Sequence, residues 1–250
     1  MFNNIPPITR NLIIINVVVY LISNLIFSQE LYFYLSGYFP LSPFFKSWQI
    51  ITHMFMHAQM GDGIGLMHII FNMFTLYSFG PILEQSLGDK KYLILYFLSG
   101  LGAYFLFNIW NFIEYQQIYS QLNAIGFDIK SYVDNPQNYL HSIRGTISIK
   151  DSELLGKLNS IMFGRMVGAS GAIFGVIAAF ATLYPDSKIG IMFIPVPVKV
   201  KYLLPIIIIG SIYLGISGNS GGVAHLAHVG GALVGFILAK IWKKHLYRFN

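Results

Sequence analysis

Three clusters of polar side chains interrupt apolar stretches of the sequence, and their residue types could together perform hydrolysis. The clusters occupy residues 68–72, 168–171 and 225–228. Ser170 carries the only hydroxyl among them, and a serine becomes a nucleophile only beside a base, for which His228 or His225 is available. His68 and Asn72, at i and i+4, would project from one face of a helix and could donate hydrogen bonds to a developing oxyanion. No carboxylate lies deep in these stretches, so a Ser-His dyad is expected instead of a triad.

Several glycines next to these clusters have a simpler interpretation. Gly171-x-x-x-Gly175 and Gly231-x-x-x-Gly235 are spacings that let membrane helices approach each other closely. Each polar cluster, taken alone, is also consistent with packing or with hydrogen bonds between helices. Only the joint placement of the three clusters favours catalysis.

Two further histidines, His53 and His57, raise the question of a metal site. They stand at i and i+4, but the zinc-protease pattern needs Glu directly after the first histidine, where this chain has Met54. We therefore expect no metal and no other cofactor, and we expect these histidines to brace a loop through hydrogen bonds. The chain has no cysteine, which excludes a thiol nucleophile and a zinc-thiolate site.

The composition places these clusters inside a membrane protein. Of 250 residues, 55% are hydrophobic and 10% are charged, and the mean hydropathy is +0.60. A soluble domain usually carries about 25% charged residues, so lipid rather than water must surround most of the side chains. The net charge of +6 comes from Lys and Arg residues that are scattered rather than gathered into a stripe, which argues against a nucleic-acid partner.

Six apolar stretches are long enough, or nearly long enough, to cross a bilayer. They lie near residues 9–27, 64–85, 92–112, 166–184, 202–217 and 223–242. The fifth is the shortest and contains Pro205, Gly210 and Gly215, which predicts a kinked or loosely packed helix. We predict one all-α membrane domain over residues 1–250, a bundle of six transmembrane helices. If the N-terminus is cytoplasmic, the cytoplasmic side holds most of the Lys and Arg residues, so both termini are predicted to be cytoplasmic.

Two connections between these stretches differ in composition. Residues 28–63 are rich in aromatic residues and prolines with almost no charge, which predicts an outer loop lying in the membrane interface. Residues 113–165 are the only sustained polar stretch, which predicts an outer loop in water. Within it we expect a short helix over 151–160, capped by Asp151 or Ser152.

This topology places the three polar clusters at one depth. The second, fourth and sixth stretches would all run inward from the outer face, and the key residue of each cluster, His68, Ser170 or His228, comes four or five residues after its stretch begins. At 1.5 Å per residue, this is roughly 6 to 8 Å below the outer surface. A transporter usually holds its site near the midplane, so the shallow depth favours hydrolysis.

The spaced motifs resemble those of the rhomboid intramembrane serine proteases. The resemblance rests on Trp48-Gln49, His68-Ile-Ile-Phe-Asn72, Gly168-Ala-Ser170-Gly171 and Ala227-His228-Val-Gly-Gly231-Ala-Leu-Val-Gly235. It implies that Ser170 is the nucleophile and His228 the general base. It also implies that three groups surround the oxyanion, namely the Ser170 backbone N–H, His68 and Asn72. It also implies that Phe174 stacks on the His228 ring. Four further residues are expected to help position these groups, namely Gly168, Gly171, His225 and Gly231.

The resemblance further implies a water-filled cavity open to the outer face. The implied substrates are single-span membrane proteins, cut near the outer end of a helix that unwinds locally, because a peptide bond within an intact helix is hydrogen-bonded and shielded. The fifth stretch and the Gly-rich residues 218–222 are our candidates for the gate and cap through which such a helix passes. We expect the protein in a bacterial plasma membrane.

The sequence departs from the family pattern in two respects. The loop motif is usually Trp-Arg and here reads Trp48-Gln49, which removes a charge from the loop. The segment between His57 and His68, and the stretch 113–165, are longer than is common. Two other functions stay open: a rhomboid-like protein that binds membrane segments without cutting them, and a transporter or channel whose path the same polar residues line.

Overall fold

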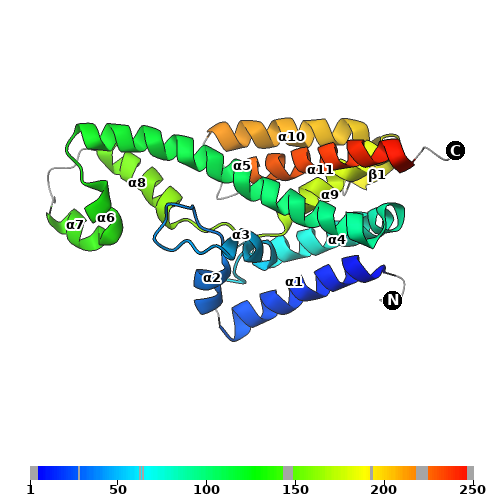
Figure 1. The fold of residues 1–250 in the computed structure, drawn as a ribbon, viewed down its shortest axis with the longest axis horizontal. Helices are drawn as coiled ribbons and strands as arrows, with labels where there is room; N and C mark the ends of the chain where they lie inside the picture. Colours follow the sequence, from blue (N-terminus) through cyan, green and yellow to red (C-terminus); the bar gives the residue numbers. More distant parts are fainter. Residues whose placement is uncertain are drawn as a thin grey trace.

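The computed structural model describes residues 5–27, 29–61, 63, 65–142, 149–191, 194–217 and 225–246; the candidate cap at 218–222 lies outside them. Within these ranges, four helices are long and apolar enough to cross a membrane. They are α1 (Pro7–Leu25), α4 (Gly65–Leu87), α5 (Asp89–Ala124) and α11 (His225–Leu246). Two shorter apolar helices, α9 (Ser170–Leu183) and α10 (Val200–Ser217), complete the bundle in Figure 1.

Each of the six predicted stretches overlaps one of these helices, but the helix in the fourth begins four residues later than predicted. Residues 166–169 are not helical, because Met166 pairs with Gly37 in an antiparallel bridge through two backbone hydrogen bonds of 2.8 Å. α9 therefore has 14 residues, which makes it roughly 21 Å long. The hydrocarbon core of a bilayer is about 30 Å thick, so α9 is a short helix that begins below one face of the bundle.

The prediction of a loop over residues 113–165 is wrong in its secondary structure. α5 continues over 36 residues to Ala124 and is followed by α6 (Ile129–Asp134), α7 (Pro136–Ser142) and α8 (Ile149–Phe163). α8 includes the helix expected over 151–160, but it begins before Asp151 and Ser152, which lie in its first turn rather than at its cap.

The segments that follow residue 113 bury an apolar core of their own, apart from the core of the bundle. Its buried members include Ile118, Leu122, Phe127, Tyr132, Leu155 and Leu158. Figure 1 shows these segments together at one end of the molecule, where α5 projects beyond the other long helices. We call residues 113–163 the helical extension.

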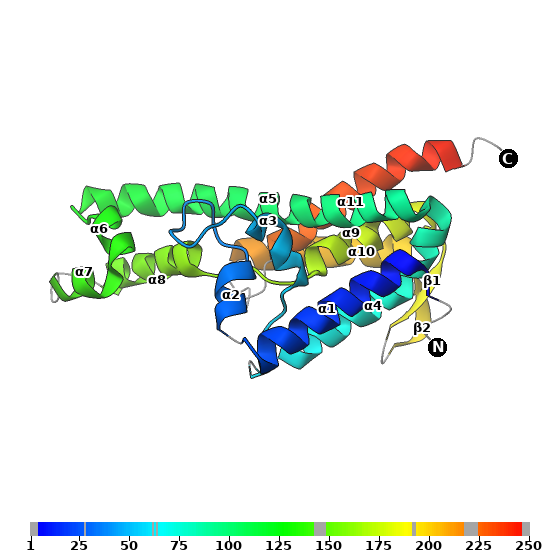
Figure 2. The ribbon, with the colours of Figure 1, turned by 60° about the horizontal axis from the view of Figure 1, so that its bottom comes forward.

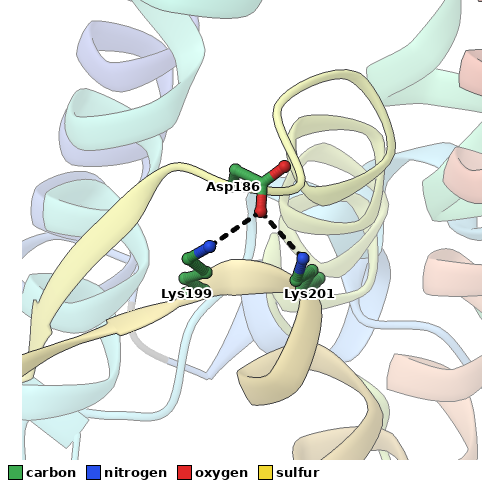
Figure 3. A network of polar contacts seen from close by, with 3 residues as sticks. All are labelled: Asp186, Lys199 and Lys201. Atoms are coloured by element: carbon green, nitrogen blue, oxygen red, sulfur yellow. Dashed lines mark hydrogen bonds and ion pairs between the residues drawn. The ribbon is translucent and has the colours of Figure 1, made fainter.

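The all-α prediction is also wrong at one place, between α9 and α10. There, β1 (Lys188–Ile191) and β2 (Ile194–Lys199) form an antiparallel hairpin. Asp186 accepts hydrogen bonds from Lys201 Nζ at 2.8 Å and from Lys199 Nζ at 3.0 Å, which ties the start of the hairpin to its end (Figure 3). These hydrogen bonds lower the pKa of the Asp186 carboxyl to about 2.

α5, α9 and α11 pack against one another at the centre of the bundle. A side chain on Gly231 would overlap the carbonyl oxygen of Gly171, and one on Gly235 would overlap that of Gly175. A side chain on Gly171 would likewise overlap Ala103 of α5. The glycine spacings are therefore the close-packing contacts that the sequence predicts.

α1 lies along α4 in the antiparallel direction (Figure 2). The Glu84 carboxylate near the end of α4 accepts hydrogen bonds from Ile8 N at 2.8 Å, Thr9 N at 2.7 Å and Thr9 Oγ1 at 2.7 Å. A carboxylate at a helix N-terminus satisfies unpaired N–H groups and complements the helix dipole. α1 thus begins at the end of the bundle where α4 ends, and α11 ends there too (Figure 1).

The predicted interfacial segment 28–63 contains α2 (Glu30–Leu35), α3 (Gln49–Thr52) and a short 3-10 helix, η2 (His53–Phe55). Gln49 organises this segment although it lacks the charge of an arginine. Its Nε2 donates to Tyr34 O at 3.3 Å and Phe44 O at 3.2 Å, and its Oε1 accepts from Lys46 N at 2.8 Å. The side chain is fully buried, so a neutral amide supplies the hydrogen bonds that hold this loop.

Candidate active site

Ser170 and His228 meet where α9 and α11 begin. Ser170 is the first residue of α9, and His228 is the fourth residue of α11. Ser170 Oγ lies 2.9 Å from His228 Nε2, and the pair is partly buried. Gly171 follows the serine directly and Gly231 comes one turn after the histidine, so the close contact of these glycines brings the two side chains together. This is the geometry of a nucleophile hydrogen-bonded to its base.

Phe174 and His225 surround the His228 ring. The Phe174 and His228 rings are stacked, with centroids 4.2 Å apart and planes inclined by 2°. His225 begins α11, and its ring stands perpendicular to that of His228, at a centroid distance of 6.0 Å. Of the two histidines that the sequence left as alternative bases, His228 is the one whose Nε2 lies within hydrogen-bond distance of Ser170 Oγ.

The backbone that leads into Ser170 is held in an extended path. Gly168 has φ +126°, a conformation that favours glycine, and its N–H donates to His53 O at 3.0 Å. A Cβ atom on Gly168 would lie 3.2 Å from His68 Nε2 and 3.4 Å from Ser170 Oγ. The space that Gly168 leaves free is therefore shared by His68 and the serine hydroxyl.

His68 and Asn72 are one turn apart on α4 and both retain hydrogen-bond donors. His68 Nδ1 accepts a hydrogen bond from Ala58 N at 3.2 Å. In a neutral imidazole with Nδ1 as acceptor, the hydrogen is on Nε2, which is the atom beside Gly168. Asn72 Nδ2 donates one hydrogen to His68 O at 2.7 Å and keeps a second. With the N-terminal N–H groups of α9, these donors could stabilise an oxyanion.

His53 and His57 brace the segment before α4, as the sequence predicts. His53 Nδ1 lies 2.9 Å from Gln49 O, and His57 Nε2 lies 2.9 Å from Asn16 Oδ1. Burial lowers the pKa of His53 to about 4 and that of His57 to about 3, so both rings are neutral near pH 7. Among the residues that the structure describes, no three His, Asp or Glu side chains gather as metal ligands would.

Asn16 and Glu84 are buried polar residues that the sequence reasoning did not select. Asn16 is fully buried on α1, and Glu84 is 1% exposed on α4. Both lie within or at the end of an apolar stretch, where a polar residue usually has a specific partner. Applied to every such stretch, that rule would have found both residues, although it would not have named their partners.

The model of the Rhomboid domain family matches residues 45–126 and 140–245 of this chain. The chain belongs to the rhomboid family. Every residue predicted for the site lies within the matched ranges: His68, Asn72, Gly168, Ser170, Gly171, Phe174, His225, His228 and Gly231. Together with its long apolar helices, this membership identifies the chain as an integral membrane protein.

Several curated rhomboid proteins are similar to this chain. The rhomboid protease GlpG of Klebsiella pneumoniae is 23% identical over 75% of this chain and 66% of its own length. The putative rhomboid protease YdcA of Bacillus subtilis is 26% identical over 76% of this chain and 66% of its own length. GlpG of Salmonella typhi is 33% identical over 72% of this chain and 63% of its own length. The match to this rhomboid chain therefore covers slightly less than two thirds of the length of each of these relatives.

Proposed function

We propose that this rhomboid is an intramembrane serine endopeptidase that cleaves transmembrane segments of other membrane proteins near their outer end. The proposal depends above all on the 2.9 Å contact between Ser170 Oγ and His228 Nε2, because a serine hydroxyl needs such a base to attack a peptide bond. It is supported by the names of the similar proteins, which are rhomboid proteases or a putative one.

In the first half of the reaction, Ser170 Oγ attacks the scissile carbonyl carbon and its proton passes to His228 Nε2. The carbonyl oxygen becomes an oxyanion that the Ser170 backbone N–H and His68 Nε2–H stabilise, with the second N–H of Asn72 as a further donor. The face of the Phe174 ring, stacked at 4.2 Å, orients the imidazolium and stabilises its charge.

In the second half, His228 returns its proton to the leaving amine nitrogen as the C–N bond breaks, which leaves an ester on Ser170. A water molecule then gives a proton to His228 Nε2 and adds its oxygen to the ester carbon. The proton returns to Ser170 Oγ as the ester C–O bond breaks, and the new carboxylate product departs. No carboxylate is needed in this scheme, because Phe174 supplies the orientation that an aspartate supplies in a triad.

We infer the orientation in the membrane from a difference between the two ends of the bundle. α9 begins, at Ser170, nearer to one end, and the opposite end holds Glu84, the hairpin and the end of α11. That opposite end also carries many lysines, including Lys188, Lys199, Lys201, Lys243 and Lys244. Excess Lys and Arg marks the cytoplasmic side. In our proposal all six apolar segments cross the membrane, α9 together with the non-helical residues 166–169 that precede it. Both termini are cytoplasmic, and the site opens toward the outer face of a bacterial plasma membrane.

We propose that single-span helices reach the site past α10. This helix contains Pro205 and lies on α11 at the edge of the bundle. Ile206 and Ile209 are each 67% exposed, and Tyr213 is 71% exposed, so a broad face of α10 has no partner among the residues that the structure describes. Crosslinking α10 to α4 should block cleavage of protein substrates and spare small ones; unchanged cleavage of protein substrates would reject α10 as the gate.

The direct test of the proposed function is labelling of the detergent-solubilised protein with a fluorescent fluorophosphonate. We expect labelling of the wild type and its loss in Ser170→Ala and His228→Ala. His225→Ala is the matched control, because this histidine is in the same turn of α11 but does not hold the serine. Cleavage of a single-span model protein, measured on gels, should follow the same order.

Two results would overturn the proposal. A folded wild-type protein that neither labels nor cuts any transmembrane substrate would favour a rhomboid that only binds membrane segments. Loss of labelling in His225→Ala with retention in His228→Ala would reject the assignment of the base.

A further inference from the structure

Two asparagines on α1 present their amide groups in the same way. Asn16 Nδ2 donates to Leu12 O at 2.8 Å, and Asn24 Nδ2 donates to Tyr20 O at 2.7 Å. In both cases the partner is the carbonyl four residues earlier in the same helix. Turning either amide around would bring two oxygens together, so these bonds fix its orientation. Each side chain therefore offers Oδ1 as an acceptor away from its own helix.

The two acceptors hold the two ends of the segment 57–60. Asn16 Oδ1 lies 2.9 Å from His57 Nε2, and Asn24 Oδ1 accepts from Met60 N at 2.8 Å. Because Asn16 presents an acceptor, the His57 hydrogen is on Nε2. Tyr32 Oη adds a hydrogen bond to His57 O. The segment 57–60 is thereby attached to α1 at two points, although residues 56–59 form no helix or strand.

Between these two attachments, the segment touches the candidate oxyanion donor. The Ala58 N–H donates to His68 Nδ1 at 3.2 Å. This bond requires Nδ1 to be unprotonated, so a neutral His68 carries its hydrogen on Nε2, the atom beside Gly168 and Ser170. Without the Ala58 N–H, both tautomers of His68 become available, and only one of them can donate toward the serine.

The sequence explains why the attachment is needed in this chain. Ten residues, 58–67, separate His57 from His68, so the chain between them has freedom that a short connection would lack. α4 begins only at Gly65, where a side chain would overlap the carbonyl of Gln59. The asparagines compensate for this length with two long-range hydrogen bonds.

We infer that Asn16 and Asn24 are positioning residues, which hold residues 57–60 so that the Ala58 N–H fixes the His68 tautomer that donates to the oxyanion. The catalytic half of this inference rests on the proposed protease function. The tautomer itself does not, so the two can be tested separately.

The test combines nitrogen NMR of ¹⁵N-histidine-labelled protein in bilayers with the kinetics of transmembrane substrate cleavage. His68 is assigned with His68→Gln, and the wild type should show hydrogen on Nε2. In Asn16→Leu and Asn24→Leu, we expect a mixture of tautomers. Removal of an oxyanion donor lowers kcat by about 10² to 10³, so Asn16→Leu should lower kcat about 10- to 100-fold, with KM within about twofold.

Two variants separate positioning from general packing. Asn16→Asp keeps an oxygen facing His57, and burial favours its neutral acid form, whose O–H can donate to Leu12 O in place of the amide. This variant should therefore retain kcat within about threefold and the wild-type tautomer. Asn108→Leu is the matched control, because Asn108 is also a buried asparagine whose Nδ2 donates to the carbonyl four residues earlier, Tyr104 O, at 2.8 Å, but it lies on α5 rather than α1. It should leave both kcat and the His68 spectrum unchanged.

The outcomes test the positioning role and the protease function separately. The inference is overturned if wild-type His68 carries its hydrogen on Nδ1, or if the tautomer is unchanged in both leucine variants. If Asn16→Leu does not fold, Asn24→Leu still decides, because its bond to Met60 lies at the exposed end of the segment. If the wild type shows hydrogen on Nε2 but cuts no substrate, the proposed protease function fails while the positioning role on His68 stands.

Discussion

Replacing Gly231 by alanine should separate the two halves of the candidate dyad without touching either of them. The new methyl group would overlap the carbonyl oxygen of Gly171. The carbonyl is part of a helix backbone and the methyl carbon is bonded directly to Cα, so neither can rotate away. A carbon and a carbonyl oxygen normally approach no closer than about 3.3 Å, so α9 and α11 must move apart by more than about 1 Å at this point.

That displacement is large relative to the Ser170–His228 contact. Adding about 1 Å to the 2.9 Å between Oγ and Nε2 exceeds the limit of a hydrogen bond. A misplacement of this size costs about 10²-fold in rate, and overpacking lowers the free energy of unfolding by about 1–3 kcal/mol. We therefore expect fluorophosphonate labelling to slow about 100-fold while the variant still folds.

The assay is the rate of labelling, measured beside the thermal unfolding of the same detergent preparation. Gly210→Ala is the matched control, because a Cβ on Gly210, in the apolar helix α10, meets nothing within 4 Å. It should label at the wild-type rate. Wild-type labelling and unfolding of Gly231→Ala would refute the reasoning, since the packing of α9 on α11 would then not set the distance between serine and histidine.

Phe174→Leu should slow labelling about 10-fold, because His228 loses its stacking partner, and a labelling time course checks this. Lowering the pH from 7.5 toward 4.5 should destabilise the fold, because unfolded histidines bind protons near pH 6.5 whereas His53 and His57 are held neutral. The pKa of His53 is lowered to about 4, so this histidine alone should reduce the free energy of unfolding by about 3 kcal/mol at pH 4.5. In His53→Gln, the unfolding temperature should therefore depend less on pH. Glu84→Gln should lower the free energy of unfolding by about 1–3 kcal/mol, because one amide oxygen cannot replace a carboxylate that accepts from three donors. Unfolding in urea measures this difference, and an unchanged urea midpoint would contradict the prediction.

The candidate site could be predicted from the sequence because its polar residues interrupt apolar stretches. Ser170, His68, Asn72 and His228 are polar groups in apolar stretches, and the predicted direction of each stretch led us to expect them at one depth. The structure brings Ser170 to 2.9 Å from His228, and it places His68 next to Gly168. The pairing of His57 with Asn16 could not be read in this way, because it joins residues 41 positions apart through one amide oxygen.

The secondary structure outside the membrane was less accessible. Hydropathy marks where α5 leaves an apolar environment, near residue 112, and not where the helix ends at Ala124. Residues that follow are polar but remain helical, because Ile118 and Leu122 pack against α8 residues such as Leu158. The hairpin of β1 and β2 was missed because its pairing depends on contacts between its two strands, which hydropathy does not register.

The length of α5 gives this small membrane protein a rigid projection beyond the bundle. Thirty-six residues of continuous helix span about 54 Å, whereas the hydrocarbon core accounts for about 30 Å. The helical extension is fixed to the projecting part through its own buried core, so it cannot rotate independently of the helices in the bilayer. A binding protein raised against α6 and α7 would therefore report the orientation of the whole bundle, and would serve as a fiducial mark for single-particle imaging of a chain that detergent otherwise hides.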